Sequence, residues 1–391
     1  MIDFRRIGSL PPYAFAEVNQ RKTEARQAGV DVIDLGFGNP DIPSPDFAVD
    51  ALVDSARDPV NHRYSASRGI EDIRVALAGR YRRRFGVELD PETEVISTIG
   101  SKEGLSHLMW ALLQPGDAAI VPDPSYPIHI YAPVIAGAEV RTAPIGSEAD
   151  YFDVVHRMFH DSWPRPRVII VSFPHNPTAH TVDLEFFSRL VDLARENEVV
   201  IVHDFAYADL GFDGYTPPSL LEVPGAKDVA VEIYSLTKGH SMAGWRVGFL
   251  CGNAEIVAAL AKLKSYLDYG TFQPIQLAAA RAIETGDQYV DQVCETYRER
   301  RDALVDGLTE GGWKVDRPAG TMFLWAEIPG PYSDMGSLEF SIHLLERAGV
   351  AVSPGIGFGP SGEGFVRFAL VDEVERLELA AQRVAETLDR L

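Results

Sequence analysis

Basic residues and cysteine are both scarce in this chain. Its 391 residues include 36 Lys and Arg against 57 Asp and Glu, so the formal net charge at pH 7 is −21. A nucleic-acid-binding surface neutralises phosphates with basic side chains, so this balance argues against a nucleic-acid partner. The two cysteines, Cys251 and Cys294, are too few for a disulfide framework and are typical of a reducing compartment.

Long apolar runs are also lacking. No stretch approaches the roughly 18 consecutive apolar residues of a membrane-spanning helix, so we expect no membrane partner. The first six residues, Met-Ile-Asp-Phe-Arg-Arg, contain no apolar core of a secretory signal. We therefore expect a cytoplasmic protein. The remaining composition, 46% hydrophobic and 24% charged, is that of a folded chain long enough for more than one domain.

Short apolar runs alternate with helical stretches over the middle of the chain. This alternation predicts an α/β fold with a mostly parallel sheet wrapped by helices. After about Gly286 the pattern changes to long helices with few strands, which predicts a smaller α+β domain. We expect an N-terminal arm and the start of the small domain over residues 1–45, a large domain over 46–285 and a C-terminal small domain over 286–391.

Reactive side chains follow the predicted strands where those strands end. Lys238 lies four residues after the apolar run Val231–Tyr234, Asp204 ends another, and Arg246 lies eight residues past the lysine. Ligands of a parallel sheet gather at the carboxyl ends of its strands. These three residue types suit pyridoxal phosphate (PLP). A lysine amine can hold its aldehyde as a Schiff base, a carboxylate can keep its ring nitrogen protonated, and an arginine can bind its phosphate.

A known family shares this arrangement. The segment from Ser235 to Gly248 reads Ser-Leu-Thr-Lys-Gly-His-Ser-Met-Ala-Gly-Trp-Arg-Val-Gly. It resembles the lysine motif of the class I/II (fold type I) PLP-dependent aminotransferases, and the resemblance extends over nearly the whole chain. The most similar branch is that of the alanine (glutamate–pyruvate) transaminases and the LL-diaminopimelate aminotransferases. The resemblance implies the fold-type-I architecture, PLP as the cofactor, and a homodimer with sites shared across its interface.

The resemblance also implies which residues meet the cofactor. Lys238 would carry the Schiff base, Asp204 would face the pyridine nitrogen, and Tyr207 would contact the 3′ oxygen, which makes these three the expected catalytic residues. Asn176, in a Pro-His-Asn-Pro string, would share the 3′ oxygen with Tyr207. The other cofactor-binding residues that it implies are Ser101 and Lys102 at a helix start, Ser235 and Arg246 in the lysine motif, Tyr126 stacked on the ring, and Tyr64 reaching the phosphate of the neighbouring subunit.

Arg367 lies between apolar residues of a strand-like run, where an arginine either extends its head to water or pairs with an anion. The resemblance implies that it binds the substrate α-carboxylate, with a backbone amide of Gly38 and the side chain of Asn176 nearby. Tyr13 would belong to an N-terminal flap over the substrate. We expect no metal, because His156 and His160, although spaced i, i+4, lack the neighbouring glutamate of a metalloprotease helix.

Together these residues predict an aminotransferase that moves an amino group between an L-amino acid and a 2-oxo acid by a ping-pong mechanism. The resemblance favours alanine and pyruvate with glutamate and 2-oxoglutarate. Diaminopimelate, aspartate or a specialised amino acid stays open, because the sequence reveals no sure second cation for a side-chain carboxylate. Two rival functions are a PLP-dependent β-lyase, which would release ammonia and pyruvate, and a PLP-binding regulator without turnover, which would usually carry a fused DNA-binding domain.

Overall fold

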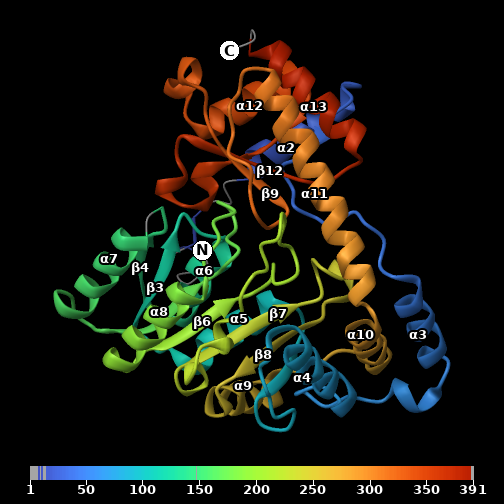
Figure 1. Cartoon of the computed structure of the whole chain (residues 1–391), viewed down its shortest axis with the longest axis vertical. Coiled ribbons are helices and arrows are strands. Elements are labelled where there is room, and N and C mark those ends of the chain that lie inside the picture. The colour runs from blue at the N-terminus through green and yellow to red at the C-terminus, as the bar shows by residue number, and fades with distance from the viewer. Residues whose placement is uncertain (1–7, 9, 12–14, 147, 389–391) are drawn as a thin grey trace, which may run out of the picture.

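A seven-stranded sheet forms the centre of the computed structural model, which describes residues 8, 10–11, 15–146 and 148–388 (Figure 1). Its strand order is β2-β8-β7-β6-β5-β3-β4. The strands are β2 (Val95–Thr98), β3 (Ala118–Asp123), β4 (Glu139–Pro144), β5 (Pro166–Val171), β6 (Val200–Asp204), β7 (Ala230–Ser235) and β8 (Gly248–Gly252). Only β8 runs antiparallel to its neighbours β2 and β7, so the predicted, mostly parallel sheet is confirmed.

Helices cover both faces of this sheet because its strands are apolar on both faces. Along β5, Ile169 packs into one buried cluster while Val168 and Ile170 pack into another. Continuous apolar strands of this kind are typical of parallel sheets buried between two helical layers. The helices of one layer are α5 (Ser101–Leu112), α6 (Pro127–Ala136) and α9 (Ala254–Leu267). Those of the other are α3 (Asp46–Ala56), α4 (Glu71–Phe85), α7 (Glu148–His160), α8 (Leu184–Asn197) and α10 (Gln273–Thr285).

Both ends of the chain build a second, smaller unit. Strand β1 (Ile33–Asp34) pairs in parallel with β10 (Val350–Ala351), so a segment near the N-terminus shares a sheet with the C-terminal part. A separate antiparallel sheet has the order β11-β12-β9. Its strands and the surrounding helices are β9 (Phe323–Glu327), β11 (Ser353–Pro354), β12 (Phe365–Ala369), α2 (Ala16–Gln27), α11 (Asp287–Glu310), α12 (Ser337–Ala348) and α13 (Val374–Thr387). The division at residues 45 and 285 stays a prediction.

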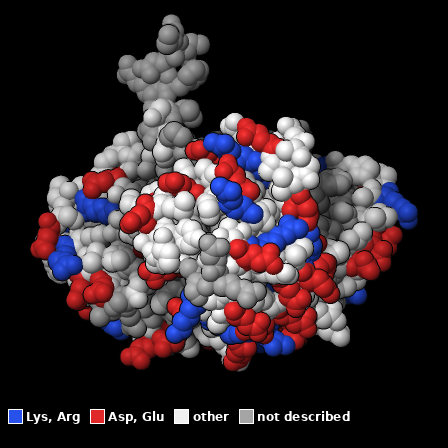
Figure 2. Space-filling model, turned by 90° about the horizontal axis from the view of Figure 1, so that it is seen from above, with Lys and Arg blue, Asp and Glu red and all other residues white. Residues whose placement is uncertain are grey.

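Short 3-10 helices complete the connections between these elements. They lie at Pro59–His62, Leu220–Glu222, Ala226–Asp228, Ala243–Trp245, Gly330–Met335, Gly355–Phe358 and Pro360–Gly362. Within the part of the chain that the structure describes, no helix is long and apolar enough to cross a membrane. Figure 2 shows broad areas of Asp and Glu with Lys and Arg interspersed on the face that carries the smaller unit, in keeping with the net charge of −21.

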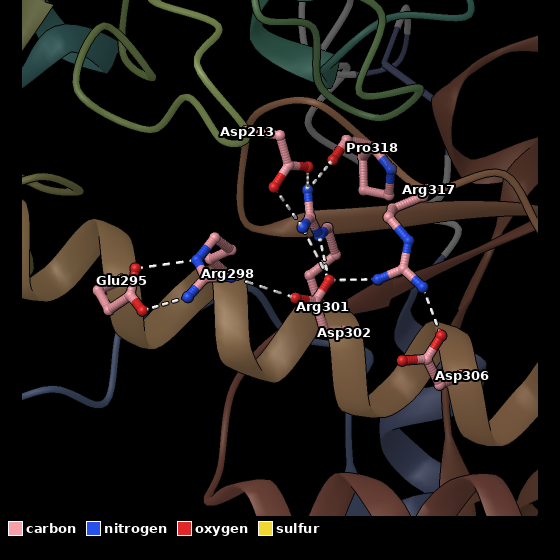
Figure 3. A network of polar contacts seen from close by, with 8 residues as sticks. All are labelled: Asp213, Glu295, Arg298, Arg301, Asp302, Asp306, Arg317 and Pro318. Atoms are coloured by element: carbon pink, nitrogen blue, oxygen red, sulfur yellow. Dashed lines mark hydrogen bonds and ion pairs between the residues drawn. The ribbon is translucent and has the colours of Figure 1, made fainter.

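A polar network joins helix α11 to segments that are remote in sequence (Figure 3). The buried Arg301 donates to Asp213, in the loop after β6, at 2.6 Å and to the carbonyl of Pro318, before β9, at 2.9 Å. Asp302 accepts from Arg301 and from Arg317, whose side chain is 39% exposed. Because Arg301 alone reaches both remote segments from a buried position, it fixes α11 between the two units.

We predict that Arg301→Met lowers the free energy of unfolding by about 1–3 kcal/mol, since it leaves the buried Pro318 carbonyl without its donor. Arg317→Met is the matched control. Its ion pairs are partly exposed, so we expect a loss below about 1 kcal/mol. Urea unfolding of the two variants measures both values. Equal losses in the two variants would contradict the special role of Arg301.

Candidate active site

A cavity of about 350 Å³ lies between the carboxyl ends of the central strands and the three-stranded sheet. Parallel strands end at the same edge of a sheet, so residues far apart in sequence meet there. The predicted residues that line this cavity are Gly38, Ser101, Lys102, Tyr126, Asn176, Asp204, Tyr207, Ser235, Lys238, Arg246 and Arg367. The structure therefore brings together eleven of the twelve predicted site residues that it describes, with Tyr64 as the exception.

Lys238 is held inside the cavity by one hydrogen bond. Its Nζ donates to the carbonyl oxygen of Gly38 at 3.1 Å. Burial, together with the positive charges of Arg367 and Arg246, lowers the pKa of Lys238 to about 7, and the negative charge of Asp204 opposes this shift. A large fraction of this amine is therefore neutral near neutral pH. A neutral amine is the form that attacks an aldehyde or removes a proton.

Asp204 is fixed by one oxygen and leaves the other without a partner. Its Oδ2 lies 2.8 Å from Nε2 of His129, whose Nδ1 lies 3.1 Å from the hydroxyl of Ser125. Its Oδ1 is buried and has no hydrogen-bond partner among the described residues. A buried carboxylate oxygen in this state favours a ligand that brings a donor to it, and a protonated pyridine nitrogen is such a donor.

Sequence reasoning missed His129, although it had one local signal. His129 lies three residues after Tyr126, at the start of α6, where a helical turn brings both side chains to one side. Their rings meet edge to face, with centroids 5.9 Å apart. The contact to Asp204 spans 75 residues of sequence and depends on tertiary structure alone.

A chain of hydrogen bonds links three predicted residues on another side of the cavity. Arg367 Nη1 donates to Asn176 Oδ1 at 2.7 Å, and Asn176 Nδ2 donates to the hydroxyl of Tyr207 at 3.2 Å. Burial raises the pKa of Tyr207, so its hydroxyl stays protonated. The Arg367 guanidinium packs against the rings of Phe323 and Phe358, 4.0 and 4.6 Å from their centroids. These contacts orient its donors for a planar anion such as a carboxylate.

The start of α5 forms an anion site with the lysine motif. The first amides of a helix have no partner within it and favour an anion. Gly100 caps α5 at φ 78°, and a Cβ at this position would collide with the guanidinium of Arg246. Gly248 likewise permits close approach, because a Cβ there would lie 2.7 Å from the backbone nitrogen of Ser101. The hydroxyls of Ser235 and Thr237, 2.8 Å apart, line the same cavity.

These features fit PLP at three points: an unpaired carboxylate oxygen for the ring nitrogen, a lysine of lowered pKa for the aldehyde, and an anion site for the phosphate. Lys102 does not point clearly to the expected phosphate site. It lines the cavity, but its Nζ lies over the ring of Tyr126, 5.5 Å from the centroid.

Among the described residues of the predicted site, Tyr64 does not line this cavity. Tyr64 is 85% exposed and packs on Tyr269, with ring centroids 4.6 Å apart. Both rings line a separate surface hollow with His62 and Phe272. Whether Tyr64 meets a phosphate in a neighbouring subunit therefore stays a prediction. Tyr13 lies outside the described residues.

Helix α2 and the segment after it also line the cavity, at positions that the sequence did not single out. The lining residues from this region are Phe15, Val18, Asn19, Lys22, Asp34, Gly36 and Phe37. The first four are spaced i, i+3, i+4 and i+7, which places them on one face of the helix. That spacing can be read from the sequence, but the sequence does not show that this face of the helix lines the cavity.

Comparison with known sequences agrees with this geometry. A family model described as Aminotransferase class I and II matches residues 30–384. The glutamate–pyruvate aminotransferase AlaC of Escherichia coli (strain K12) is 51% identical over 381 residues, which cover 97% of this chain and 92% of the relative. An LL-diaminopimelate aminotransferase of Desulforudis audaxviator is 42% identical over 390 residues, covering 100% of this chain and 99% of the relative.

Solved structures show the same overall arrangement. Substrate-bound BacF from Bacillus subtilis has a TM-score of 0.93 and 34% identity, over 99% of this chain and 98% of that chain. A single mutant of Thermus thermophilus aspartate aminotransferase has a TM-score of 0.90 and 30% identity, over 99% of this chain and 100% of that chain.

We predict that the rate at which the cofactor-free protein takes up PLP rises with pH through a midpoint of about 7, because only the neutral form of Lys238 attacks the aldehyde. Arg367→Met removes a positive charge that lowers this pKa, so the midpoint should move to higher pH. Arg367→Lys keeps the charge and serves as the control. Stopped-flow absorbance at a series of pH values gives the midpoints, and an unshifted Arg367→Met profile would refute this electrostatic account.

Proposed function

The chain belongs to the class I and II aminotransferases and uses pyridoxal 5′-phosphate, and we propose that it pairs alanine and pyruvate with glutamate and 2-oxoglutarate. Family membership confirms the predicted fold class, cofactor and transaminase activity (EC 2.6.1). The substrate proposal rests on the 51% identity to a glutamate–pyruvate aminotransferase. Diaminopimelate is the second candidate, because relatives described as LL-diaminopimelate aminotransferases reach 42% identity over nearly the whole chain.

We propose that the predicted residues hold the cofactor as follows. Lys238 would bind its aldehyde carbon and Asp204 its ring nitrogen, with His129 keeping the carboxylate in place. Asn176 and Tyr207 would contact the 3′ oxygen. The remaining cofactor-binding residues that we propose are Ser101, Lys102, Ser235 and Arg246 for the phosphate and Tyr126 for the face of the ring. The bound cofactor supplies an electron sink for the negative charge that develops at the substrate Cα.

The protein's own groups would then orient the substrate and move its proton. Arg367, already directed by two aromatic rings, would bind the α-carboxylate with its two parallel donors. The Gly38 amide would add a donor to the same group. Lys238 Nζ, a large fraction of which is neutral near pH 7, would remove the Cα proton as general base and, as general acid, deliver it to the cofactor carbon in the same half-reaction. The opposite half-reaction would reverse both transfers.

We also propose a homodimer in the cytoplasm. The exposed rings of Tyr64, Tyr269 and Phe272 gather at one surface hollow, and a cluster of this kind is typical of a protein interface. In the dimer, Tyr64 would reach the phosphate of the partner's cofactor. The free thiols of Cys251 and Cys294 suit a reducing compartment.

We predict that Lys238→Ala lowers transamination at least about 10³-fold, because it removes both the covalent anchor and the general base. The absorbance of the lysine-bound cofactor should also disappear, while the variant stays a folded dimer by size-exclusion chromatography. Lys262→Ala changes an exposed lysine on α9 and is the matched control. Near-normal turnover by the Lys238 variant would overturn its assigned role.

The substrate proposal predicts that alanine and glutamate convert the holoenzyme to its amino form with kcat/KM at least tenfold higher than aspartate or LL-diaminopimelate. Spectra of the first half-reaction with each donor measure this directly. A preference for LL-diaminopimelate would select the second candidate instead. Assay of ammonia and pyruvate in the same mixtures tests for β-lyase chemistry.

A further inference from the structure

Helix α2 presents a lysine to the active-site cavity from a fixed position. Lys22 lines the cavity on the same helical face as Val18, the buried residue one turn earlier. Ala25, on an adjoining face, packs against Leu345 of α12 and Ala351 of β10. The packing of α2 on the C-terminal unit therefore sets the direction of Lys22, whose side chain is only 13% exposed.

Lys22 shares one carboxylate with a second cation. Its Nζ lies 2.7 Å from Asp34 Oδ2, and Arg26, one turn further along α2, approaches the same oxygen at 3.4 Å. Arg26 is 51% exposed and lies outside the cavity lining, whereas Lys22 and Asp34 belong to it. Two positive charges and one negative charge leave a surplus of one positive charge, and Lys22 is the cation of this trio that faces the cavity.

This trio adjoins the residue expected to bind the substrate α-carboxylate. Asp34 Oδ1 accepts from the backbone nitrogen of Gly36 at 3.3 Å, and the carbonyl of Gly36 accepts from Arg367 Nη2 at 3.3 Å. Two residues, Asp34 and Gly36, thus link Lys22 to Arg367 through direct contacts. A substrate with carboxylates at both ends can meet Arg367 with one and a second cation with the other.

We propose that Lys22 binds the distal carboxylate of glutamate and of 2-oxoglutarate, an inference that rests on the proposed function. When Lys22 turns to the substrate, Arg26 would remain beside Asp34, so the Asp34 carboxylate would keep one cationic partner. Alanine and pyruvate have no second carboxylate and leave the pair of Lys22 and Asp34 intact. One cavity can in this way accept both a neutral and an acidic side chain.

The main rival explanation is that the ion pair only ties α2 to β1. The two explanations differ in what they predict for the removal of the Asp34 charge. If the pair is only structural, removing either partner removes its stabilising effect, so Lys22→Met and Asp34→Asn should change the activity in the same direction. If Lys22 binds substrate, Asp34 competes for it, so removing the aspartate charge should act in the opposite direction.

The test measures kcat/KM of the first half-reaction for glutamate and for alanine on the holoenzyme of each variant. Lys22→Met should lower the ratio of glutamate to alanine at least tenfold, while Asp34→Asn should raise it. Arg21→Met changes an exposed arginine of the same helix that pairs with Glu346, and its ratio should match the unmodified chain. Because both donors are measured on the same preparation, partial misfolding cancels in the ratio.

A binding measurement adds a readout that is independent of turnover. Glutarate is a non-reacting dicarboxylate, and its affinity for the holoenzyme, measured by calorimetry, should fall at least tenfold in Lys22→Met. Equal losses with glutamate and alanine, parallel effects of Lys22→Met and Asp34→Asn, or unchanged glutarate binding would each overturn the inference. If the unmodified enzyme does not use glutamate at all, the proposed function itself fails, and the donor spectra show this before any variant is made.

Discussion

The rest of the active site depends on the burial of one amine among positive charges. Lys238 is buried at the cavity with Arg246 and Arg367 near enough to lower its pKa, and Asp204 is the acid that opposes them. An ammonium is costly there, so the neutral amine that the chemistry needs is favoured near neutral pH without a separate base. The same arginines suit the anionic ends of the cofactor and the substrate. The same positive charges therefore favour the neutral form of Lys238 and suit the binding of the anionic cofactor and substrate.

This arrangement requires both ends of the chain to meet at the edge of the central sheet. The pairing of β1 with β10 brings the loop of Gly36 and Gly38 beside the C-terminal unit. That loop then contacts Lys238 through the Gly38 carbonyl and Arg367 through the Gly36 carbonyl. The buried contacts of Arg301 on α11 hold the large and small units around this meeting point. The geometry of the site is thus a property of the whole fold.

The sequence predicted the parts of the site that have local signals. Asp204 ends an apolar run, Lys238 follows another and Arg246 lies eight residues past the lysine, and the rule that ligands gather at the carboxyl ends of parallel strands was enough to expect them together. The direction of β8 was not predictable, because a short apolar run does not reveal whether its partners are parallel. His129 was missed because its contact to Asp204 joins segments 75 residues apart. Tyr64 lies outside the described cavity, and its predicted role requires a second copy of the chain.

The proposed role of Lys22 would allow one site to serve substrates of different charge. An enzyme that accepts both alanine and glutamate needs a cation for the second carboxylate, yet that cation must not remain buried and unpaired when alanine is bound. An ion pair at the cavity wall would meet both requirements. With alanine bound, Asp34 would remain the partner of Lys22. With glutamate bound, Lys22 would pair with the substrate and Arg26 would remain the partner of Asp34. The sequence could not reveal this second cation, since the direction of the i, i+3, i+4, i+7 face of α2 depends on the packing of Ala25, on an adjoining face, against α12, more than 300 residues away.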